Sequence, residues 1–93
     1  MKIDFTPKYK TEQEMLEAVK IRAFSIKFIN NPSLEVQLEA VKRNGTSIQY
    51  IKDQTPIVVY HALKSTHNLN HHLIHITEEE WIKFEDENPE LFI

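Results

Sequence analysis

The sequence contains no cysteine, one glycine and four prolines among its 93 residues. Without cysteine there is no disulfide framework, no thiolate nucleophile and no cysteine-ligated zinc. So little glycine and proline disfavours an all-β fold, which needs many turn residues. The longest uninterrupted apolar run, residues 57–60, is too short to cross a bilayer, and the N-terminus lacks the apolar core of a secretory signal. We therefore expect a cytoplasmic protein without a membrane partner.

The composition is that of an ordinary folded domain. Apolar residues make up 41% and charged residues 27%, which is too apolar for a disordered chain. The formal net charge is −3, and acidic residues interrupt the stretches of lysine and arginine. This charge pattern disfavours a nucleic-acid partner. No phosphate-binding glycine loop, nucleophile motif or evident carboxylate pair is present, so we expect no enzymatic activity and no cofactor.

A repeat of 22 residues organises the chain. Residues 16–33 align without a gap on residues 38–55, and eight of the eighteen positions are identical. Hydroxyl residues suited to cap a helix N-terminus recur at the same interval, at Thr11, Ser33, Thr55 and Thr77. The interval predicts one helical-repeat domain over residues 1–93, with a lead-in at 1–10, repeats at 11–32, 33–54 and 55–76, and a partial C-terminal repeat at 77–93.

Each unit is predicted to be a helix of about three turns, a corner and a second helix of about two turns. Gly45 stands at the corner of the second unit, where we expect a left-handed residue to end the helix. The residues Ala18, Ala40 and Ala62 share one repeat position, where successive long helices should approach closely. The β-branched residues 57–60 would suit a strand, but the repeat frame favours a helix there. The predicted fold class is all-α, a small solenoid of about four 22-residue helix-turn-helix units.

Residues 40–51 read A-V-K-R-N-G-T-S-I-Q-Y-I. This stretch resembles the A-V-K-x-N-G-x-x-I-x-Y-I helical repeat of bacterial and phage proteins, which is grouped as a domain of unknown function. The resemblance is close over 34–55, good over 12–33, and weak beyond. In the first unit Arg22 and Ala23 replace the Asn-Gly corner. The resemblance implies stacked short helix pairs, often encoded in phage or prophage genes, and brings no catalytic residues.

All five histidines lie within fifteen residues, between His61 and His75. If residues 68–76 are helical, His67, His71 and His75 fall on one face at the spacing by which a helix presents imidazoles to a metal ion. The alternatives are a polar, partly exposed face and a pH-sensitive surface, because clustered imidazoles repel one another once protonated. We take the polar face as the main interpretation, with no metal site, and the metal- or pH-responsive module as the alternative.

The C-terminal segment is strongly acidic, with a net charge of −6 over residues 77–93 against +3 over 1–76. Acidic residues at 78–80 suit a helix N-terminus, but Glu85, Asp86 and Glu87 stand near a helix C-terminus, where negative charge is unfavourable. Aromatic residues lie among them. Trp81 and Phe92 either close the core or form a hydrophobic anchor rimmed by charge, as at the centre of an interface.

These features predict a non-enzymatic protein-interaction module. We expect a phage- or prophage-type accessory protein that inhibits or adapts a host protein. Self-association through residues 91–93 is a further possibility. The predicted partner-binding residues are Trp81, Phe84, Glu85, Asp86, Glu87, His71 and His72.

Overall fold

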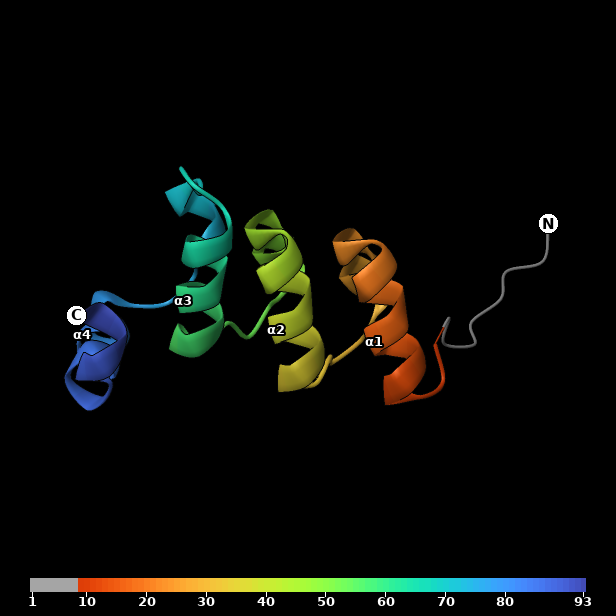
Figure 1. The fold of residues 1–93 in the computed structure, drawn as a ribbon, viewed down its shortest axis with the longest axis horizontal. Helices are drawn as coiled ribbons and strands as arrows, with labels where there is room; N and C mark the ends of the chain where they lie inside the picture. The colour runs from red at the N-terminus through yellow and green to blue at the C-terminus, as the bar shows by residue number, and fades with distance from the viewer. Residues whose placement is uncertain (1–8) are drawn as a thin grey trace.

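The computed structural model describes residues 9–93, which are helical and contain no strand (Figure 1). Four ten-residue α-helices begin at intervals of 22 residues: α1 (Glu12–Ile21), α2 (Leu34–Arg43), α3 (Pro56–Ser65) and α4 (Glu78–Glu87). The all-α prediction is confirmed for these residues, and residues 57–60 belong to a helix rather than a strand. All but the last two residues of the predicted lead-in, 1–10, lie outside the described part of the chain.

A 3-10 helix follows each α-helix: η1 (Ala23–Phe28), η2 (Gly45–Tyr50), η3 (His71–Leu73) and η4 (Pro89–Phe92). The sequence predicted a second helix of about two turns in each full unit, and these helices are 3-10 helices, six residues long in the first two units and three residues long in the third. A 3-10 helix brings side chains three residues apart onto one line. Ile26 and Ile48 are buried within η1 and η2, and Ile29 and Ile51, which directly follow these helices in an extended conformation, are buried as well.

The α-helices begin at the predicted capping residues. The hydroxyl oxygen of Thr11 accepts a hydrogen bond from the backbone N–H of Glu14 at 3.1 Å, and that of Thr77 accepts from Glu80 at 3.1 Å. Ser33 caps α2 in the same way. Thr55 makes no such bond and is followed by Pro56, whose fixed φ suits the first helical position.

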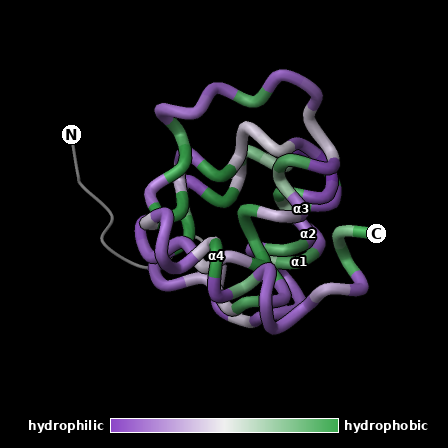
Figure 2. Tube along the Cα trace, turned by 90° about the vertical axis from the view of Figure 1, so that its left-hand side faces the viewer, coloured by the Kyte–Doolittle hydropathy of each residue, from purple (hydrophilic) through white to green (hydrophobic). Residues whose placement is uncertain are grey.

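The helices α1, α2 and α3 lie side by side in one row, and η1 and η2 form a second row behind them (Figure 1). Viewed along the row, the three α-helices stand one behind another (Figure 2). The core fills the space between the rows. Its buried side chains come from both, and they are Val19, Val36, Ala40, Val41, Val58, Val59 and Ala62 in the α-helices and Ile26, Ile29, Ile48, Ile51 and Leu69 behind them. None of the helices in residues 9–93 combines the length and apolar composition that crossing a membrane requires.

The three corners share one backbone conformation. Arg22, Asn44 and Thr66 end α1, α2 and α3 with extended φ and ψ angles, and each donates its N–H to the alanine four residues earlier. The replacement of the Asn-Gly pair in the first unit therefore leaves the turn unchanged. The prediction of a left-handed Gly45 is wrong, because no glycine among the described residues has a positive φ.

Gly45 is needed instead for a close approach between units. A Cβ atom at this position would lie 2.3 Å from the carbonyl oxygen of Ala62 and 2.6 Å from the hydroxyl oxygen of Thr66. The N–H of Gly45 donates to that hydroxyl at 2.7 Å. The hydroxyl of Ser65 also donates to the carbonyl oxygen of Val41. The second and third corners are thus joined by hydrogen bonds between backbone groups of the second unit and the hydroxyls of Ser65 and Thr66.

A buried amide joins the second unit to the segment after α3. Gln54 is only 8% exposed. Its Nε2 donates to the carbonyl oxygens of Ile48 at 3.1 Å and Leu73 at 2.8 Å, and its Oε1 accepts from the N–H of His75 at 2.7 Å. Pro32 occupies the same repeat position one unit earlier and has no side chain that can do this. The Gln54 amide therefore holds the irregular segment 66–76 in place.

We predict that Gly45→Ala destabilises the fold by about 1–3 kcal/mol, because the added methyl forces the backbones of two corners apart. The unfolding free energy is measured by urea denaturation followed by circular dichroism. Ala23→Gly, at the equivalent corner of the first unit, is the control and should lower stability by less than about 1 kcal/mol. Equal stability of Gly45→Ala and the wild type would show that the two corners do not constrain each other.

We predict that Gln54→Leu lowers the unfolding free energy by about 2 kcal/mol or more, because the N–H of His75 loses its acceptor and two carbonyl oxygens lose a donor. Urea denaturation is again the measurement. Gln49→Leu provides the matched control, since Gln49 is exposed, and it should stay within about 0.5 kcal/mol of the wild type. Similar effects of the two substitutions would contradict a structural role for the Gln54 amide.

Candidate functional site

The exposed surface of α4 is acidic. Six of its ten residues are acidic and one, Lys83, is basic. Lys83 lies 3.9 Å from Glu87, and this is the only ion pair of α4 in the described part of the chain. Asp86 and Glu87 are exposed and Glu85 is half-buried. The helix therefore presents a concentrated negative charge that the described residues scarcely neutralise.

Aromatic rings attach α4 and η4 to α3. Tyr60 of α3 meets Phe84 and Phe92 with ring centroids 6.2 and 5.6 Å apart, and Trp81 meets the same two rings at 5.5 and 5.7 Å. The hydroxyl of Tyr60 donates to the carbonyl oxygen of Leu91 at 3.3 Å. The Tyr60–Phe92 and Trp81–Phe92 pairs are edge-to-face, an arrangement that stabilises by about 0.5–1.5 kcal/mol per pair beyond the buried area. The four rings, which we call the aromatic cluster, hold the C-terminal segment to the row of helices.

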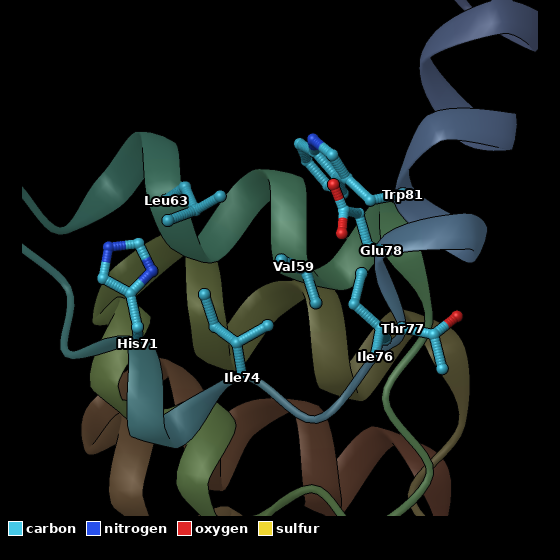
Figure 3. A pocket seen from close by; sticks show the side chains of 8 residues that line it. All are labelled: Val59, Leu63, His71, Ile74, Ile76, Thr77, Glu78 and Trp81. Atoms are coloured by element: carbon cyan, nitrogen blue, oxygen red, sulfur yellow. The ribbon is translucent and has the colours of Figure 1, made fainter.

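An apolar groove lies between α3 and α4 (Figure 3). Its volume is about 430 Å³. Its apolar walls are Val59 and Leu63 of α3, Ile74 and Ile76 of the connecting segment, and Trp81 of α4. The polar residues at its edge are His71, Thr77 and Glu78. Figure 3 shows His71 near Leu63 at one end and Glu78 beside Trp81 at the other.

The structure brings together only some of the residues predicted to bind a partner. Trp81 and His71 line the groove, whereas Phe84 lies in the aromatic cluster. Trp81 fits both sequence interpretations, because it packs against the core and also forms a groove wall. Glu85, Asp86 and Glu87 lie on the second half of α4 and are not part of the groove, and neither is the exposed His72.

Five residues that line the groove were not among the predicted partner-binding residues, namely Val59, Leu63, Ile74, Ile76 and Glu78. A comparison of repeat positions contains a signal for the groove. Phe84 stands at the fourth-unit position of the alanines Ala18, Ala40 and Ala62. A phenylalanine cannot allow the close helix approach that an alanine allows. This substitution therefore predicts that α4 lies farther from α3 than the first three α-helices lie from one another.

The three histidines of the alternative metal site are not brought together. Their grouping required a helix over 68–76, but only His71–Leu73 is helical, and it is a 3-10 turn. Asn68 has a positive φ of 59°, which an α-helix does not allow, and the Gln54 amide binds the backbone at Leu73 and His75. Among residues 9–93 there is no group of three or more histidine, aspartate or glutamate side chains placed to hold a metal ion.

The surroundings of His61 on α3 lower the pKa of its imidazole. Partial burial on α3 lowers its pKa below the ordinary value of 6.5, and repulsion from the ammonium groups of Lys42 and Lys64 lowers it further. These lysines share one repeat position on neighbouring helices. Protonation of His61 is therefore opposed by one lysine from each of two neighbouring helices.

No protein-family model, curated protein or solved structure gives a significant match to this chain. The resemblance of residues 40–51 to the A-V-K-x-N-G repeat therefore stays a prediction.

We predict that Lys42→Gln raises the pKa of His61 towards 6.5, because one of the two repelling ammonium groups is removed. The pKa should stay below 6.5, since burial and Lys64 remain. A proton NMR titration of the imidazole ring measures it. Lys52→Gln, at an exposed position that does not act on His61, is the control. An unchanged pKa in Lys42→Gln would contradict the proximity of the two side chains.

The lowered pKa of His61 also determines whether its contribution to stability rises or falls with pH. Between the pKa of His61 in the folded protein and 6.5, the unfolded chain binds more protons than the folded one. The contribution of His61 to stability is therefore complete above pH 6.5 and is lost as the pH falls through the lowered pKa. Thermal unfolding below pH 6.5 should consequently show a smaller loss in His61→Gln than in the wild type.

Proposed function

We propose that the chain is a four-unit helical-repeat solenoid that serves as a non-enzymatic protein-interaction module, and that its acidic helix α4 binds a positively charged surface of a partner protein. The 22-residue interval between the α-helices and the row formed by α1, α2 and α3 support the repeat architecture. Short helices of this kind bury their apolar faces only by stacking. The A-V-K-x-N-G resemblance supports an accessory role in a phage or prophage, acting on a host protein.

The observation that carries this proposal is the charge at the C-terminal end of α4. Glu85, Asp86 and Glu87 face the negative end of the helix dipole, where each acidic side chain costs roughly 0.3–1 kcal/mol. Of these three, Glu87 alone forms an ion pair within residues 9–93, with the Lys83 side chain at 3.9 Å. The helix dipole makes this arrangement unfavourable for the fold. A complementary basic surface on a partner would gain from it in association rate and specificity.

The test is the triple substitution Glu85→Lys, Asp86→Lys and Glu87→Lys. We expect it to abolish capture of the partner in affinity purification from host cells. The same variant should be as stable as the wild type or more so, because lysines suit a helix C-terminus. Circular dichroism and thermal unfolding measure the second expectation. Loss of binding together with retained stability would show that the substitutions remove the binding surface and do not unfold the protein.

Reversal of three exposed acids elsewhere, Glu17→Lys, Glu35→Lys and Asp53→Lys, changes the net charge by the same amount and serves as the control. This control should still capture the partner. The proposal is wrong if the α4 variant captures the same proteins as the wild type, or if both triple variants lose them equally.

A further inference from the structure

The groove between α3 and α4 lies where a neighbouring helix covers the equivalent face of α1 and of α2. Val19 of α1 and Val41 of α2 occupy one repeat position and are fully buried within the row of helices. Leu63 stands at the same position in α3, and it is 38% exposed. The face of α3 that a regularly stacked fourth helix would cover is thus left partly open.

Phe84 accounts for the opening. It takes the position at which the first three units carry an alanine, and its ring packs in the aromatic cluster against Tyr60. In Figure 1, α4 is offset towards one end of α3 instead of continuing the row. The connection along Ile74 and Ile76 forms one side of the space that remains, and Trp81 forms another. The cavity of about 430 Å³ lies within the size range of about 300–1,000 Å³ for small-ligand pockets.

The charge at the groove indicates what kind of side chains would complement it. Glu78 borders the groove, and Glu79 follows it in the first turn of α4. Both are exposed, and neither forms an ion pair within residues 9–93. An apolar groove with an acidic border is complementary to an apolar side chain flanked by lysine or arginine.

We infer that the groove binds a lysine- or arginine-rich amphipathic helix of the partner, whose leucine or phenylalanine side chains contact Leu63 and Trp81. A helix is the element that covers the equivalent face in the preceding units, and helix-in-groove recognition uses apolar anchors three and four residues apart. This inference rests on the proposed function and adds a second contact, separate from Glu85, Asp86 and Glu87. The acidic end of α4 supplies charge, and the groove supplies the apolar anchor site.

The single tryptophan of the chain lies in the groove and provides the signal. The probe is a synthetic tryptophan-free peptide that forms an amphipathic helix with leucines on one face and lysines on the other. We expect saturable binding accompanied by a blue shift of the Trp81 emission. A control peptide with alanines in place of the leucines should give no blue shift, and one with glutamates in place of the lysines should not bind.

The matched variants are Leu63→Gln, in the groove, and Leu34→Gln, on the exposed part of α2. Neither changes the net charge. Leu63→Gln should weaken binding of the leucine-lysine peptide by about tenfold or more, as expected for an anchor contact. Leu34→Gln should bind like the wild type. The circular dichroism spectrum confirms that both variants fold, and Leu63→Ala should show a smaller loss in the same direction.

The outcomes distinguish this inference from the proposed function. If Leu63→Gln binds the peptide and the partner as the wild type does, while the triple lysine variant of α4 loses the partner, the groove is not the anchor site and the proposed function stands. If neither variant loses the partner, both are wrong. Light scattering of the free protein tests a second copy as occupant. Self-association that Leu63→Gln abolishes would overturn the assignment to a basic helix.

Discussion

The close approach of successive α-helices over small residues is the constraint on which the remaining structure depends. Ala40 and Ala62 are fully buried, and a side chain at Gly45 would overlap the carbonyl oxygen of Ala62. Each α-helix has only ten residues, so it is too short to be stable alone in water. Contact at this spacing lets the neighbouring units bury one continuous core, and the corner hydrogen bond from Gly45 to Thr66 maintains the spacing.

The C-terminal unit departs from this constraint, and the candidate site is the consequence. Phe84 replaces the small residue, and rings instead of close backbones hold α4 to α3. The same departure leaves Leu63 partly exposed and opens the groove beside Trp81. Acidic side chains then gather on the helix that borders the opening. The opening thus follows from one altered repeat position, and the acidic residues of α4 add negative charge beside it.

The histidines lie close together in the sequence, but their side chains do not form one site within residues 9–93. An α-helix would have aligned His67 with His71 and His75, but the backbone at Asn68 is left-handed and interrupts it. The Gln54 amide, from a different unit, takes the hydrogen-bonding groups of Leu73 and His75. Only His71 reaches the groove. Pairing with a distant residue decided the conformation of this segment, and no local pattern contains that information.

The sequence alone determined the helical class, the 22-residue interval, the capping residues and the acidic character of α4, because these follow from local spacing and residue type. Only the tertiary structure decided that the second segments are 3-10 helices, that Gly45 serves a contact with Ala62, and that Gln54 joins two units. It also decided that Leu63 and Trp81 share a groove. Each of these depends on contacts between different units, whose distances are set by packing and not by the order of residues along the chain.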